Sequence, residues 1–148
     1  MSNKSRHKDF TPNSWETVGD NKLSTALYMK MLTSEAYLTL SSNATRLYTY
    51  MKLQLYGQHG KDKIQDPENK GRDCFVFNKA MWSKDTDNPH SYRLFGNGKQ
   101  FKQYKSELIE HGFIDEVQSN WTTREKNIYC FSSRWKTWQS KDAQNIPP

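Results

Sequence analysis

A helical stripe that leads directly into a hairpin is the feature that most constrains the fold. Large side chains recur there at intervals of three and four, which places them on one face of an α-helix. Asn97 is a suitable N-cap residue, and Gly112 stands where a helix end favours a left-handed residue. Two strand-like runs follow, at residues 113–117 and 127–132, so the sequence predicts a β-hairpin after the helix. The side chains of the stripe are Phe101, Tyr104, Lys105, Leu108 and Ile109.

A second amphipathic helix is predicted upstream, beginning near residue 42. Ser41 or Ser42 can cap it, and Gly57 can end it. A short helix over residues 34–38 leads into it. The apolar face of the second helix is formed by Ala44, Leu47, Tyr48, Met51 and Leu55.

The segment between these two helices has a mixed character. Residues 60–72 are rich in Lys, Asp, Asn and Pro, which predicts a solvated, flexible loop. Residues 74–77 are apolar and β-prone, and Asn78 can cap a brief helix that extends to Trp82. Residues 83–90 contain Asp, Asn and Pro and predict a break.

The resulting order is helix, loop, strand, short helix, turn, amphipathic helix and hairpin. This order predicts an α+β fold of the winged helix-turn-helix type, with a helical core and a small antiparallel sheet. We expect one domain over residues 22–138, because residues 1–21 and 139–148 hold few apolar anchors and predict flexible tails.

Charge and polar patterning predict binding of double-stranded DNA. The formal net charge is +6, which favours a polyanionic partner. One face of the predicted 97–112 helix is polar, and a helix in the major groove can read bases through Gln and Lys. The alternative is an ordinary solvated helix face. The candidate base-reading residues are Lys99, Gln100, Lys102, Gln103 and Ser106.

The tip of the predicted hairpin, at residues 118–126, offers a second candidate surface. Basic side chains on a flexible hairpin contact phosphates or the minor groove, where they add affinity but little sequence information. Its single tryptophan could stack on a base or sugar, or could equally pack back onto the domain. The candidate residues of the tip are Trp121, Thr122, Thr123, Arg124 and Lys126.

Several short patterns lie in residues 37–41, 44–48, 101, 106–115, 127–129 and 132–136. Together they resemble the winged-helix proteins of Gram-positive plasmids and integrative elements. The resemblance covers about residues 32–138, and it implies DNA binding in plasmid replication or conjugative transfer. Initiators of that group usually carry a second region that recruits replication partners, and 148 residues leave no room for one, which favours an accessory or regulatory role.

Catalysis, cofactors and metals are not expected. Cys74 and Cys130 lack zinc-ligand spacing. They fall in strands that pair in a winged helix and could approach each other, but the absence of a signal peptide or membrane span predicts a cytoplasmic protein in which both remain buried thiols. Asp115 and Glu116 point to opposite faces of a strand, where we expect them to serve solubility. The glycines before Lys99 depart from a phosphate-binding loop, since the next residue is Gln100.

Three rival functions remain open. A transcriptional regulator would use the same DNA-binding surfaces, and a protein-interaction adaptor could use the same fold without DNA. An enzyme acting on nucleic acid is disfavoured, because no clustered carboxylates or activated nucleophile are visible. The expected partners are double-stranded DNA, replication or transfer proteins of the same element, and a second copy of the chain in a homodimer.

Overall fold

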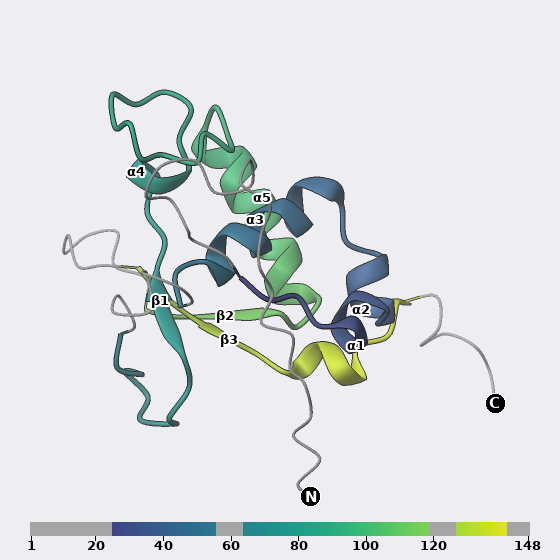
Figure 1. Ribbon diagram of the computed structural model, residues 1–148. Helices are drawn as coiled ribbons and strands as arrows, with labels where there is room; N and C mark the ends of the chain where they lie inside the picture. Colours follow the sequence, from purple (N-terminus) through teal and green to yellow (C-terminus); the bar gives the residue numbers. More distant parts are fainter. Residues whose placement is uncertain (1–24, 56–63, 119–126, 142–148) are drawn as a thin grey trace, which may run out of the picture.

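The computed structural model describes residues 25–55, 64–118 and 127–141 (Figure 1). The described chain has a mixed α+β architecture with a three-stranded antiparallel sheet. The predicted 1–21 tail lies outside the described residues. In chain order the elements are α1 (Met29–Leu32), α2 (Glu35–Leu38), α3 (Ser42–Lys52), β1 (Cys74–Val76), α4 (Lys79–Trp82), α5 (Gly98–Glu110), β2 (Ile114–Gln118), β3 (Ile128–Phe131) and the 3-10 helix η2 (Arg134–Thr137).

The predicted N-caps start their helices. The Ser41 side chain accepts a hydrogen bond from the Ala44 amide at the start of α3, and Asn97 accepts one from the Gln100 amide at the start of α5. These bonds satisfy amides that have no partner within the helix. α3 ends at Lys52, earlier than predicted, although Leu55 still packs against the core.

Polar contacts fix α5 against α3. The Ser41 hydroxyl donates to a Glu107 carboxylate oxygen at 2.6 Å, and the Ser41 amide lies 3.3 Å from both Glu107 oxygens. Nearer the middle of α5, the Asn43 amide group donates to the Tyr104 hydroxyl at 3.0 Å. Hydrogen bonds to a carboxylate are stronger than neutral ones, so the start of α3 is tied to the last turn of α5.

The sheet has the strand order β1-β3-β2, and the predicted hairpin is confirmed in the antiparallel pairing of β2 with β3. Its inner face packs on the helices through Phe75, Tyr129 and Phe131. Its outer face carries a separate small cluster built around Cys74, Ile128 and Cys130. This alternation follows from the two-residue period of a strand.

Gly112 makes the turn from α5 into β2. Its φ is +85°, in the left-handed region, and its carbonyl accepts a hydrogen bond from the Trp135 amide at 3.1 Å. A Cβ at this position would lie 2.6 Å from the Trp135 backbone nitrogen. Next to it, the Phe113 and Trp135 rings stack with centroids 6.1 Å apart, so Trp135 packs against the core.

The expectation of two free thiols is wrong, because Cys74 and Cys130 form a disulfide. The physical reason lies in the strand register. The two residues oppose each other directly on β1 and β3, and their Cα atoms are 4.1 Å apart. Directly opposed side chains project from the same face of a sheet, so the sulfur atoms meet.

The described part of the predicted 60–72 loop, residues 64–72, is a largely exposed loop that is anchored to the sheet. The Ile64 amide donates to the Cys74 carbonyl at 2.9 Å. Asp66 is buried, and its carboxylate accepts from the backbone amides of Glu68, Lys70 and Arg72 at 2.8 to 3.3 Å. The buried Asp66 carboxylate therefore organises this segment over the outer face of the sheet. The polar composition of the segment gave no sign that one of its carboxylates is buried.

Replacing Gly112 by Ala is expected to destabilise the fold by about 1–3 kcal/mol, because the new Cβ meets backbone atoms and the left-handed conformation disfavours it. Denaturant unfolding measures the change. Gly98→Ala is the control, since a Cβ there meets no atom within 4 Å and should leave stability unchanged or raised. Equal effects of the two substitutions would contradict this account of the turn.

Reduction of the disulfide is expected to lower the free energy of unfolding by about 4 kcal/mol, because the bond closes a long loop with a sequence separation of 56 residues. Denaturant unfolding with and without a reducing agent gives the difference. In a Cys74→Ala, Cys130→Ala double variant the reducing agent should have no effect. If the oxidised chain is no more stable than the reduced one, the bond does not constrain the unfolded state.

Candidate nucleic-acid interface

The polar side chains predicted on α5 lie together on its exposed face. All five candidate residues are exposed, while Phe101 and Leu108 on the opposite side are buried in the core. Tyr104 and Ile109 are partly buried against the same core. The sequence prediction of which side of this helix faces the protein is therefore confirmed. The exposed candidates are Lys99, Gln100, Lys102, Gln103 and Ser106.

Charge is distributed unequally along α5. Its first eight residues contain three lysines and no acidic residue, and its carboxylates, Glu107 and Glu110, occupy the last turn. Glu107 is already bonded to Ser41. The unpaired amides at a helix N-terminus add a partial positive charge. The N-terminal half of α5 is thus the more attractive end for an anion.

Gln100 has a second task at the start of α5. Its side-chain oxygen accepts a hydrogen bond from the Gly96 amide at 3.2 Å, while its own amide donates to Asn97. This reciprocal arrangement resembles a capping box. Among the candidate residues of the helix, Gln100 therefore also has a structural role, because its side chain is hydrogen-bonded at the N-terminus of α5.

The candidate residues of the hairpin tip, Trp121 to Lys126, lie outside the described residues. The structure describes the two strands on either side of the tip: β2 ends at Gln118, and β3 begins at Ile128. The register between β2 and β3 shifts between Glu116 and Gln118, so the hairpin bends near its tip.

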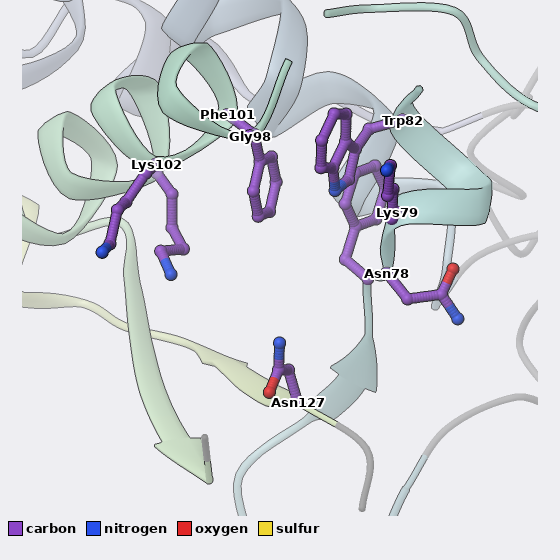
Figure 2. A pocket seen from close by; sticks show the side chains of 9 residues that line it. Asn78, Lys79, Trp82, Gly98, Phe101, Lys102 and Asn127 are labelled. Atoms are coloured by element: carbon purple, nitrogen blue, oxygen red, sulfur yellow. The ribbon is translucent and has the colours of Figure 1, made fainter. Parts of the chain in front are cut away.

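A cavity of about 350 Å³ opens between α4, the start of α5 and the start of β3 (Figure 2). Sequence reasoning did not find it, because its walls come from three segments that are far apart in the chain. The only available signal was the lysine spacing on α5 beside Phe101. The residues that line the cavity are Phe77, Asn78, Lys79, Trp82, Gly98, Phe101, Lys102, Lys105 and Asn127.

Aromatic rings form one wall of the cavity. The Trp82 and Phe101 rings stack with centroids 4.8 Å apart and planes 9° apart, and Phe77 stacks on Phe101 at 6.3 Å. These three residues are at least nine-tenths buried, so only part of each ring reaches the cavity. Figure 2 shows the Trp82 and Phe101 side chains on one side of the cavity and Asn127 across from them.

The cavity is also lined by Lys105, which forms an ion pair with β2. Its Nζ lies 2.8 Å from a Glu116 carboxylate oxygen, and both side chains are largely buried. Burial and the nearby Glu116 carboxylate raise the pKa of Tyr129 well above its ordinary value. Glu116 therefore balances a buried lysine, and the expectation that it serves only strand solubility is wrong.

Asp115 also has partners, on the outer face of the sheet. Its carboxylate bridges Arg72 at 3.2 Å and Arg134 at 2.6 Å. Arg72 in turn forms an ion pair with Asp66 at 3.1 Å. The Asp66 side chain is 2% exposed. The Arg72 hydrogen bond, together with backbone amides, lowers the pKa of Asp66 to about 2. The network ties residues 64–72 and η2 to β2, so Asp115 is structural as well.

Among the described residues, one group has metal-ligand spacing: Asp66, Cys74 and Cys130. Both sulfur atoms belong to the disulfide, so they are not thiolate ligands. His111 ends α5, where its Nδ1 lies 2.9 Å from the Glu107 carbonyl and its ring stacks on Trp138. His111 is thus the C-cap residue of α5.

No family model, curated protein or solved structure matches this chain. Within the described ranges, no helix has both the length and the apolar character needed to cross a membrane.

Asp66→Asn is expected to reduce the acid sensitivity of the fold. The folded pKa of Asp66 is depressed from 3.8 to about 2, so its stabilising contribution is present above pH 4 and lost as the pH falls towards 2. The free energy of unfolding, measured between pH 7 and pH 2, should fall less steeply below pH 4 in the variant. Asp87→Asn, at an exposed carboxylate, is the control and should keep the wild-type slope.

Proposed function

We propose that this protein binds double-stranded DNA as a winged helix. In this proposal α3, α4 and α5 are the three helices, and β2 and β3 are the strands of the wing. The position of β1 between α3 and α4, together with the strand order β1-β3-β2, supports this arrangement. α5 is then the helix that enters the major groove.

The observation that carries the proposal is the exposed basic face on the N-terminal half of α5. Lys99 and Lys102 can reach guanine acceptors, and Gln103 can make paired hydrogen bonds to adenine. Recognition helices contact base edges mainly with their N-terminal residues. The carboxylates of α5 lie at its other end, where they would not repel the phosphates.

The connection between α4 and α5 is longer than the three or four residues usual in a helix-turn-helix. Residues 83–97 separate the two helices, and Leu94 and Phe95 in this segment are buried. Backbone hydrogen bonds from Leu94 and Phe95 to the Trp82 carbonyl hold the connection against α4. The segment is therefore folded onto the domain and leaves the exposed face of α5 open.

The hairpin tip completes the proposed interface. Arg124 and Lys126 would contact phosphates or the minor groove, with Thr122 and Thr123 as hydrogen-bonding neighbours. Trp121 could stack on DNA or pack on the domain. α5 would then supply sequence specificity, and the tip would supply affinity.

The resemblance to winged-helix proteins of plasmids and integrative elements suggests the process. We propose an accessory or regulatory role in plasmid replication or conjugative transfer, without catalysis, with other proteins of the same element as partners. A transcriptional regulator and a homodimer are compatible with the same interface. This role places the protein in the cytoplasm, and the disulfide weighs against that location because such bonds are rare there.

A protein-interaction adaptor is the second candidate, and one observation favours it. Tyr28, Met29 and Leu38 are 65–72% exposed on and beside α1 and α2. Figure 1 shows these helices next to η2, on the opposite side of the molecule from α4. A protein partner could bind there, and such binding would depend little on salt.

Binding of a mixed-sequence duplex pool, followed by fluorescence anisotropy, tests the proposal. We expect affinity to fall steeply with salt, because bound lysines and arginines displace condensed counterions. Gln103→Ala should weaken the site selected from a random pool by about 1–3 kcal/mol and leave non-specific binding nearly unchanged. Lys30→Gln, at an exposed lysine of α1, is the control and should change neither.

The hairpin tip should behave in the opposite way in the same assay. Replacing Arg124 and Lys126 together should weaken specific and non-specific binding alike and flatten the salt slope by about one unit for each lost phosphate contact. Circular dichroism establishes that the variants are folded. If only the tip variant changed the sequence preference, the roles of helix and hairpin would be reversed. No binding at low salt would favour the adaptor.

A further inference from the structure

We propose that the cavity between α4, α5 and β3 binds one unpaired nucleotide of a bound DNA strand. The base would lie against the Trp82 and Phe101 wall, and the phosphate would lie near Lys79 and Lys102. This inference rests on the proposed DNA binding, and it adds an unpaired nucleotide as a ligand beside the duplex.

The size and the wall of the cavity suit a single base. Its volume of about 350 Å³ is near the lower end of the range of small-molecule sites, which is about 300–1,000 Å³. The stacked Trp82 and Phe101 rings are held in place by the core. Bases of any sequence stack on aromatic side chains, because every base has a π-face.

The polar groups at the cavity suit the phosphate and the hydrogen-bonding edge of the base. Lys79 and Lys102 are exposed at its border, and each brings a positive charge from a different helix. The Asn127 side chain points across the cavity towards Phe101 (Figure 2). An amide both donates and accepts hydrogen bonds, so it can meet the edge of a base. Lys105 also lines the cavity, and Glu116 balances its charge.

The position of the cavity favours a nucleotide within a strand over a free one. Lys102 belongs both to the cavity lining and to the exposed face of α5 proposed to contact DNA. Asn127 directly precedes β3, the second strand of the hairpin. The cavity thus lies beside the exposed face of α5, where a base leaving a duplex bound to that face would enter it.

The test compares a paired duplex with the same duplex carrying one unpaired 2-aminopurine, a fluorescent adenine analogue. We expect about tenfold tighter binding of the second duplex, the order of magnitude that stacking of one base provides, and a loss of 2-aminopurine emission on binding. Gly98→Leu should abolish both effects by filling the cavity, because a Cβ there meets no protein atom within 4 Å. Gly98→Ala is its control and should retain both.

The lysine contribution is tested by a second matched pair. Lys79→Gln should reduce the preference for the unpaired base about threefold, whereas Lys84→Gln, at an exposed lysine outside the cavity lining, should leave it unchanged. Addition of deoxyadenosine monophosphate distinguishes the source of the nucleotide. If it removes the preference at concentrations that leave paired-duplex binding intact, the cavity takes free nucleotides and the strand-bound inference is overturned.

The remaining outcomes separate this inference from the proposed function. Equal affinity for both duplexes would overturn the cavity inference and leave duplex binding in place. A preference that survives Gly98→Leu unchanged would also overturn it, because the unpaired base would then bind elsewhere. Failure to bind either duplex at low salt would overturn the proposed function itself.

Discussion

The arrangement of the domain depends on how α5 is held between α3 and the sheet. Glu107 provides the polar part of this attachment, because its carboxylate accepts hydrogen bonds from the backbone and side chain of Ser41. Ser41 is also the N-cap of α3, so one serine both starts a helix and fixes its neighbour. Phe101 and Leu108 bury the apolar side of α5. With that side fixed, the lysines of the N-terminal half must face outwards.

The turn at Gly112 fixes the position of β2, and so of the sheet, relative to α5. A left-handed residue there lets the chain reverse within a few residues and brings Phe113 beneath Trp135. β2 then pairs with β3, and β3 pairs with β1, which returns to the start of α4. The helix, the hairpin and α4 are therefore held in one arrangement, and the cavity lies where they meet.

Charged side chains form ion pairs on both faces of the sheet. On the outer face, Asp66 and Asp115 form ion pairs with Arg72 and Arg134. On the inner face Glu116 is paired with Lys105. Lys99 and Lys102 are exposed on α5. Positive potential is thus available on the side where α5 and the cavity lie, which is what a polyanionic ligand requires.

The sequence by itself determined the local elements. The stripes of α3 and α5, the caps at Ser41 and Asn97, and Gly112 were all readable, because each depends on residues within a few positions of one another. Only the tertiary structure decided which distant residues meet. The Cys74–Cys130 bond, the burial of Asp66 and the cavity shared by Lys79, Lys102 and Asn127 all depend on strand register and helix packing. Register and packing are set by the whole core at once, so no local pattern in the chain could reveal them.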